Sequence, residues 1–277
     1  RESTLNLDES SEERHLTPLS DCAWNLSVAL YYKAGGRPWR LASARDGVCY
    51  VGVAYRQTGK GPGSKTACCA AQMFLDDGDG VVFMGEYGPW YSPEHKEFHL
   101  NRHAARKLLE GVLASYQRLG GKTLKEVFLH CRSSINAEEF SGFSSACPPG
   151  VSLIGIRVRH ERHGVRLFRE GSRPVLRGAF WPVSERRGFL WASGFKPRLG
   201  TYDGWEVPVP LCIDIQHGDG DIAQIARDIF ALTKLNYNAC RLGESQPVTV
   251  GFSDAVGEIL VSSPRGLPAS PKFKFYI

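Results

Sequence analysis

The stretch Val48-Cys49-Tyr50-Val51-Gly52-Val53-Ala54 is an unbroken run of apolar and small residues, with the length of one β-strand. Such runs are typical of strands that are buried on both faces, in the middle of a sheet covered by helices. A glycine-rich turn over residues 59–63 follows and predicts a reversal of the chain. We therefore expect this strand at the centre of a sheet, with a hairpin partner beside it.

The segments on either side predict further strands and a helix. Before the central strand, residues 21–33 carry apolar side chains at helical spacing, and the turn at residues 35–38 ends this helix. After it, residues 67–74 and 80–85 are candidate strands, joined by Asp-Gly steps that favour a tight reversal.

The rest of the chain alternates between strands and helices. Residues 103–119 have a helical period of apolar side chains, and Asp221 is a candidate N-cap for a later helix. A last strand over residues 247–252 and a short helix over residues 253–260 end the pattern. Other strands are expected at residues 126–130, 151–158, 165–168, 188–191 and 211–215. The order predicts one α/β domain with a mixed β-sheet.

Composition agrees with a globular protein that stays outside membranes. The chain has 277 residues, 42% of them hydrophobic, and lacks an apolar run of the roughly 18 residues that a membrane span needs. Its beginning is polar and acidic, unlike a signal peptide, which is basic and then apolar. We therefore expect a cytoplasmic protein with no membrane partner.

Basic residues are slightly in excess and unevenly distributed. Lysine and arginine exceed aspartate and glutamate by 34 to 29, and the net charge of +5 is compatible with a polyanionic partner. Several basic residues gather between Arg157 and Arg169, partly with the alternation of a strand. This run is either a solvated face or a surface for phosphates, and the sequence leaves both interpretations open.

Four stretches carry a resemblance to a known family. The first is Tyr31-Tyr32-Lys33-Ala34-Gly35-Gly36-Arg37-Pro38-Trp39, a turn placed before the central strand, which is the second. The third covers residues 127–140, and the fourth covers residues 232–260 and begins with Leu232-Thr233-Lys234-Leu235-Asn236-Tyr237-Asn238. In this order and at this spacing they resemble the PIWI domain of prokaryotic Argonautes, of a catalytically inactive type.

The resemblance implies an RNase H-like mixed β-sheet flanked by helices. It also implies that residues 1–36 are the C-terminal end of a MID-like domain and residues 37–277 the PIWI domain. In this fold, carboxylates at the ends of neighbouring strands hold two divalent cations about 4 Å apart for phosphodiester hydrolysis. Oxygen ligands are needed because Mg²⁺ and Mn²⁺ are hard ions.

Matched residue by residue, this metal site is degraded. Ala54 stands where the family has its first acid and Arg132 where it has the next strand acid, whereas the last acid matches Asp254. A guanidinium is never deprotonated at neutral pH, so Arg132 would put a fixed positive charge where a dication belongs. The fourth ligand, a glutamate on a loop, has three candidates, which are Glu86, Glu94 and Glu97.

We therefore expect no catalytic metal pair and no nuclease activity. The loss also looks native, because a designed inactivation has no reason to carry a second, oppositely charged replacement at Arg132. As an alternative, a rearranged set of acids could rescue cleavage, with Asp76, Asp77 or Glu139 as candidates.

The resemblance further implies a guide strand whose 5′ phosphate lies at the junction with the MID domain. Lys33 matches a lysine that contacts this phosphate, although a lysine at the end of a helix also suits the helix dipole. The carboxylate of Ile277 matches a C-terminus that helps to hold one Mg²⁺ there. Expected contacts to the guide backbone are Thr233, Lys234, Asn236 and Asn238, with Arg177, Lys196 and Arg198 as weaker candidates.

These expectations lead to one functional hypothesis and two alternatives. The leading hypothesis is a bacterial defence protein that carries a short guide RNA or DNA and holds a complementary target without cleaving it, together with a separate effector protein. The alternatives are a metal-dependent, guide-directed endonuclease with rearranged acids, and a domain that serves only as a protein-interaction scaffold. If guide pairing supplies specificity, binding depends steeply on salt and little on sequence.

Overall fold

The structure, a computed structural model, describes residues 19–43, 45–57, 66–74, 80–92, 94–118, 122–161, 164–202, 204–237 and 243–251. Among the residues singled out from the sequence, five lie outside this part of the chain: Asp76, Asp77, Asn238, Asp254 and Ile277.

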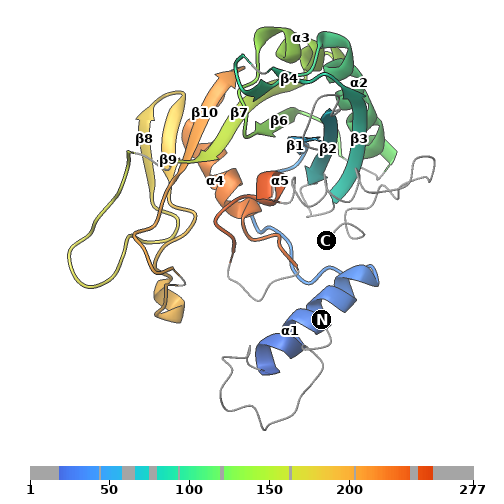
Figure 1. Ribbon diagram of the computed structural model, residues 1–277. Coiled ribbons are helices and arrows are strands. Elements are labelled where there is room, and N and C mark those ends of the chain that lie inside the picture. Colours follow the sequence, from blue (N-terminus) through green and yellow to red (C-terminus); the bar gives the residue numbers. More distant parts are fainter. Residues whose placement is uncertain are drawn as a thin grey trace.

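A large mixed β-sheet organises the described residues (Figure 1). Its strands are β1 (Val48–Gln57), β2 (Thr66–Phe74), β3 (Gly80–Gly88), β6 (Glu126–Cys131), β7 (Ser152–His160), β8 (Phe180–Ser184), β9 (Arg187–Leu190) and β10 (Leu211–His217). They lie in the order β3-β2-β1-β6-β7-β10-β9-β8, while β4 (Tyr91–Ser92) and β5 (Glu97–Phe98) form a separate pair.

The direction of the strands identifies the fold. β1, β6 and β7 run parallel to one another, and β2 and β3 extend the sheet on the β1 side as antiparallel neighbours. On the other side, β10 is antiparallel to β7. This is the RNase H-like arrangement that the resemblance implied, with β1 in the interior of the sheet.

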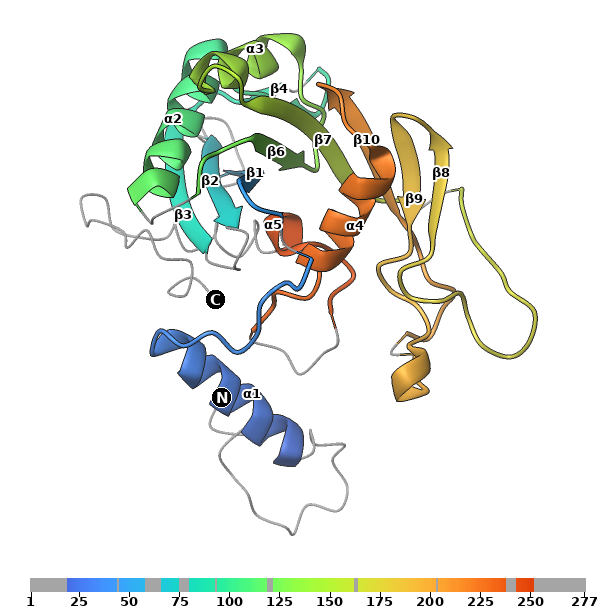
Figure 2. The same cartoon turned by 180° about the vertical axis from the view of Figure 1, so that it is seen from behind.

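Helices lie on both faces of the sheet. They are α1 (Leu19–Lys33), α2 (Arg102–Arg118), α3 (Ala137–Ala146), α4 (Ile222–Leu232) and α5 (Val248–Gly251), with a short 3-10 helix, η2 (Pro197–Leu199). α2 and α3 lie together on one face and α4 and α5 on the other, whereas α1 lies apart from the sheet (Figures 1 and 2). None of the described helices is long and apolar enough to cross a membrane.

The alternation of side chains along β1 explains why helices cover both faces. Cys49 and Val51 belong to the core formed with α2 and α3, whereas Val48 and Tyr50 belong to the core formed with α4. Successive residues of a strand point to opposite faces, so an unbroken apolar run needs an apolar layer on each side. The prediction of a central, doubly covered strand is therefore confirmed.

α5 approaches β1 more closely than a side chain would allow. A Cβ added to Gly52 would lie 1.8 Å from the carbonyl oxygen of Thr249 in α5. The hydroxyl of Thr249 is also 2.8 Å from Nδ1 of His130 on β6, and both residues are buried. This packing joins α5 to the neighbouring strands β1 and β6.

Most of the expected elements are present, but two predictions of strands are wrong. Residues 247–252 contain the helix α5, because β1 and β6 already have partners on both sides and the apolar residues Val248 and Val250 pack against the sheet instead. Residues 165–168 form no strand, and Leu167 and Phe168 are exposed in a long connection. The sequence analysis also missed α3 and the edge strand β8.

Candidate functional site

The candidate site lies where the parallel pairing of β1 with β6 ends. In the parallel pair of β1 and β6, Val53 lies opposite Cys131, so the next residues, Ala54 and Arg132, meet at one edge of the sheet. Ala54 is buried and its methyl group offers no metal ligand, whereas Arg132 is exposed. The two positions where the resemblance expects acids are thus adjacent, and neither carries a carboxylate.

Arg132 is held from two directions. Its Nη2 donates a hydrogen bond to Oε1 of Gln246, 2.8 Å away, in the segment that precedes α5. Its carbonyl oxygen accepts a hydrogen bond from Nε of Arg157 on β7 at 3.3 Å. Both the side chain and the backbone of Arg132 are therefore anchored to neighbouring elements.

Glu97 is the candidate loop glutamate that bonds to this edge. Its Oε2 accepts a hydrogen bond from the hydroxyl of Ser134 at 2.6 Å, and its Oε1 lies 3.8 Å from Nη2 of Arg157. The hydrogen bond from Ser134, with a further contribution from His99, lowers the pKa of Glu97. Glu94 is exposed in the turn between β4 and β5, and the side chain of Glu86 is outside the described residues.

Glu139, a candidate for rescuing catalysis, is buried beneath this edge. It accepts hydrogen bonds from the phenol of Tyr55 and from the backbone N–H of Leu100, the latter at 3.3 Å. Its Oε2 also lies 3.5 Å from Nδ1 of His99. Burial raises the pKa of Glu139, so its environment favours the protonated form.

The described acids of this region do not converge as ligands for a pair of divalent cations. His99 stands between the two glutamates, with Nε2 3.3 Å from Glu97 and Nδ1 3.5 Å from Glu139, so the three groups form a row and do not converge on one point. In the part of the chain that is described, no group of three or more histidine, cysteine, aspartate or glutamate side chains could hold a metal ion. Arg132 adds a positive charge at the same edge.

A second candidate site gathers three of the residues expected to contact a guide backbone. Nη2 of Arg177 donates a hydrogen bond to the hydroxyl of Thr233 at 2.7 Å, just after α4. The guanidinium of Arg177 lies 4.5 Å from the ring centre of Phe230, and Nζ of Lys234 lies 4.9 Å from the same ring centre. We call these four residues the Phe230 cluster.

The Phe230 cluster concentrates positive charge. Burial, and then the charge of Arg177, lower the pKa of Lys234. The aromatic face stabilises the two cations, because its quadrupole is negative there. The two cations are well suited to a phosphate, whereas the hydroxyl of the buried Thr233 donates to the carbonyl oxygen of Phe230 at 2.6 Å and serves to position Arg177.

The Phe230 cluster is joined to the end of α1. Nε1 of Trp39 donates a hydrogen bond to the carbonyl oxygen of Lys234 at 2.7 Å, and the hydroxyl of Tyr237 donates to the carbonyl oxygen of Trp39 at 2.9 Å. The ring of Tyr237 packs on that of Tyr32, with centres 4.6 Å apart. Lys33, the neighbour of Tyr32, is therefore brought towards the segment that follows α4.

The other expected contacts are arranged differently. Asn236 donates a hydrogen bond from Nδ2 to Oε1 of Glu244 at 2.9 Å, which fits a role in ordering the chain. Lys196 is buried at the start of η2, with 7% of its surface exposed, and Arg198 in η2 is exposed. We therefore do not count Lys196 and Arg198 among the residues of the Phe230 cluster.

Sequence reasoning missed the ring of Phe230 and the network around Glu139. An aromatic residue in an amphipathic helix predicts only core packing, and nothing local in the sequence pairs it with Arg177. For Glu139, its place three residues after Asn136 was a usable signal, because Asn136 caps α3 through a hydrogen bond from the N–H of Glu139.

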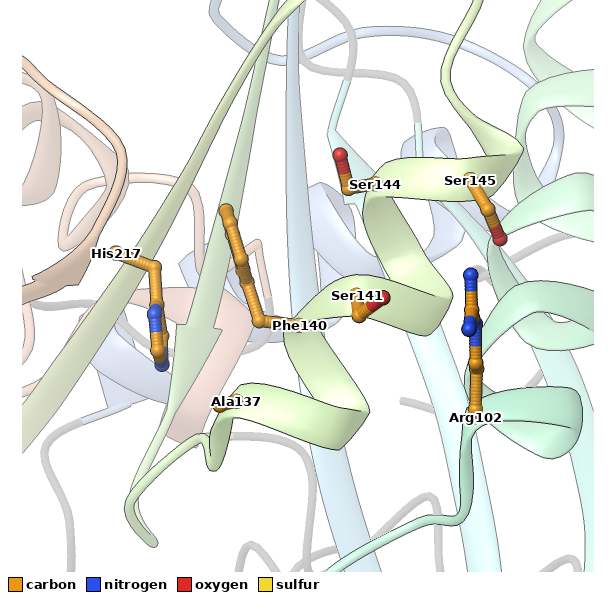
Figure 3. Close-up of a pocket in the computed structure, with 7 residues that line it drawn as sticks. All are labelled: Arg102, Ala137, Phe140, Ser141, Ser144, Ser145 and His217. Carbon is orange, nitrogen blue, oxygen red and sulfur yellow. The ribbon is translucent and has the colours of Figure 1, made fainter.

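A separate hollow of about 380 Å³ lies over α3, away from the residues predicted from the sequence. Figure 3 shows the rings of Phe140 and His217 face to face, with centres 4.4 Å apart, and Arg102 on the opposite side of the hollow. Its lining, which also includes Ala137, Ser141, Ser144 and Ser145, contains no carboxylate. The hollow therefore offers no oxygen-rich ligand set for a divalent cation.

Comparison with known proteins supports the fold. No protein-family model and no curated protein matches the sequence. The structure of A. aeolicus Argonaute matches 91% of this chain with a TM-score of 0.67 at 17% identity, and a structure of the same Argonaute with externally bound siRNA gives 0.65 over 91% at 17% identity.

A third match is the Clostridium butyricum Argonaute bound to a guide DNA and a 19-mer target DNA, with a TM-score of 0.63 over 95% of this chain at 17% identity. The matched regions make up 34%, 33% and 32% of these three proteins, so this chain spans about a third of their length. The chain therefore has an Argonaute-like fold, with the RNase H-like sheet of the PIWI domain.

Proposed function

We propose that this protein binds a short nucleic-acid guide and holds a complementary target without cleaving it. The observation that carries the proposal is that Ala54 and Arg132 directly follow Val53 and Cys131, the last residues paired between β1 and β6. The fold is that of proteins whose structures include one with guide and target DNA. At the edge where that fold family cleaves phosphodiesters, this chain has a methyl group and a guanidinium in place of two carboxylates.

The Phe230 cluster supports the guide-binding part of the proposal. Its two cations disfavour one another, and an incoming phosphate relieves that repulsion, so binding of an anion there is electrostatically favourable. Arg177 and Thr233 are already joined by a hydrogen bond, which reduces the cost of ordering them on binding. This surface suits backbone contacts that are independent of base sequence.

The 5′ end of the guide is proposed to lie near Lys33, at the junction of residues 1–36 with the rest of the chain. Asn238 and the carboxylate of Ile277 remain part of this proposal, with one Mg²⁺ between that carboxylate and the phosphate. Removal of Ile277 is expected to weaken guide binding without unfolding the protein, as measured by guide titration and thermal melting. Normal guide affinity in that variant would exclude the role.

A cleavage assay tests the inactive site directly. The natural full-length protein is loaded with guide and given a matched, end-labelled target and Mn²⁺. We expect a guide-dependent complex and an intact target. Cleavage that depends on guide and Mn²⁺ and is lost in Asp254→Ala would instead favour a nuclease with rearranged acids.

The biological proposal is a role in bacterial defence, with a separate effector protein acting after target recognition. Sequencing of the nucleic acid that co-purifies with the full-length protein decides between RNA and DNA for each strand. It is expected to yield short strands with 5′ phosphates. Absence of such strands, together with no affinity for added guides, would favour the scaffold hypothesis.

A further inference from the structure

We propose that Arg132 is a metal-independent contact for a phosphodiester of the target strand at the edge formed by β1 and β6. This inference rests on the proposed function, because it assumes that the target lies across this edge. It reverses the role of the position: where the fold family holds cations that in turn bind the phosphate, this chain supplies the positive charge from its own side chain.

The position of Arg132 is the first argument. The parallel register puts it beside Ala54, and the small side chain of Ala54 leaves the neighbouring position without a carboxylate that would repel a phosphate. Arg132 is exposed, so a strand can reach it from solvent. A guanidinium is planar and can offer two parallel N–H donors to phosphate oxygens.

The second argument is that Arg132 is preorganised. The hydrogen bond from its Nη2 to Gln246 directs the head group, and the hydrogen bond from Arg157 fixes its carbonyl oxygen. Gln246 lies in the segment that precedes α5, so the head group of Arg132 is tied to that segment. A side chain that is already ordered loses less conformational entropy when it binds a ligand.

The third argument is that Glu97, which bonds to the same edge, already has partners. The carboxylate of Glu97 accepts a hydrogen bond from the hydroxyl of Ser134 at 2.6 Å and lies 3.8 Å from Nη2 of Arg157. Its negative charge is therefore largely balanced within the protein. The described acid of this network thus already has partners on the segment after β6 and on β7.

The test measures target affinity of the guide-loaded, full-length protein in EDTA and in Mg²⁺, with the guide loaded beforehand. We expect the parent protein to hold the target equally well in both. Arg132→Ala should weaken target binding roughly tenfold and reduce the slope of log Kd against log salt by about 1. The matched control is Arg227→Ala, which removes another exposed arginine bonded to a glutamine, Gln224; its target affinity should change less than about twofold.

A scan with single neutral methylphosphonate linkages along the target locates the contact. In the parent, one linkage should weaken binding by about as much as Arg132→Ala does, and in Arg132→Ala that linkage should have no further effect. Arg132→Lys, which keeps the charge, should retain the salt slope and lose part of the affinity. Thermal melting identifies any variant that fails to fold. If Arg132→Ala does not fold, Arg132→Lys and the methylphosphonate scan of the parent protein decide the test.

The outcomes separate this inference from the proposed function. Guide-dependent target binding with no effect at Arg132 and no sensitive linkage would overturn the inference alone. Target affinity that falls in EDTA while the guide stays bound would also overturn it. Absence of any guide-dependent target binding by the parent protein would overturn the proposed function itself.

Discussion

At the scale of single residues, Gly52 shows how backbone packing shapes the candidate site. Its lack of a Cβ lets α5 contact β1, because that atom would lie 1.8 Å from the carbonyl oxygen of Thr249. Sequence alone marks Gly52 as a glycine inside a strand, which predicts a bulge or a close approach without naming the partner.

Gly52→Ala is therefore expected to destabilise the protein by at least about 2 kcal/mol, because a backbone group must move. Urea unfolding measures the change. Gly164→Ala is the matched control, since a Cβ there meets nothing within 4 Å, and its stability should stay within about 0.5 kcal/mol of the parent. Equal effects from the two substitutions would contradict the close approach of α5.

His130 should make the stability of the protein depend on pH. Burial lowers its pKa from 6.5 to about 3, so the folded protein keeps it neutral while the unfolded chain takes up a proton below pH 6.5. The contribution of His130 to the free energy of unfolding is therefore fully present above pH 6.5 and is lost as the pH falls towards 3. Between pH 6.5 and 4.5 the loss is on the order of 2–3 kcal/mol.

His130→Gln keeps a side chain that can bond to Thr249 and removes the titration. We expect its free energy of unfolding to vary less between pH 6.5 and 4.5 than that of the parent. The slope of this free energy against pH should correspond to about one proton fewer taken up on unfolding. The exposed His95 provides the control His95→Gln, which should leave the parent slope nearly unchanged. An unaltered slope in His130→Gln would mean that His130 is accessible to protons in the folded state.

At the scale of elements, α4 and the connection that follows β7 together form the Phe230 cluster. Arg177 and Thr233 are 56 residues apart in the sequence, and only the packing of these elements brings them together. Arg169 and Arg173 repeat the same motif on Phe195, with guanidinium carbons 5.6 and 5.1 Å from its ring centre. Basic residues in this region are thus ordered on aromatic faces.

Arg177→Ala is expected to weaken guide binding roughly tenfold and to lower the salt slope by about 1. Arg118→Ala is the matched control, because Arg118 also donates to a hydroxyl, that of Ser115 at 3.0 Å, but lies on α2 across the sheet. Its guide affinity should match the parent within about twofold. Similar losses in both variants would indicate general electrostatics and no specific contact.

At the scale of the whole molecule, the parallel pairing of β1 with β6 brings positions 54 and 132 together whatever residues occupy them. We therefore expect two carboxylates placed at these positions to lie close enough to share a cation. The double variant Ala54→Asp with Arg132→Asp is expected to bind Mn²⁺. Its Tm should rise by roughly 5 °C when the Mn²⁺ concentration is about a hundred times the Kd for the ion. The uncharged pair Ala54→Asn with Arg132→Asn should show no such rise, and neither should the parent.

Much of the fold could be predicted from the sequence, because its signals are local. The apolar run of β1, the helical periods of α2 and α4, and the N-cap Asp221 each depend on residues near one another in the chain. The two positions Ala54 and Arg132 could be located for the same reason, since each belongs to or follows a recognisable strand.

Tertiary structure decided what local patterns could not. Residues 248–251 form a helix because the sheet has no vacant place beside β1 and β6, although their apolar side chains suit a strand. Glu139 meets Tyr55, Leu100 and His99 because segments distant in the sequence pack around it. Arg177 and Lys234 meet on one ring because two elements distant in sequence pack together. The sequence by itself determined most of the strands and helices and the identity of Ala54 and Arg132 after two of the strands, whereas long-range packing decided the helix α5 and which charges face one another.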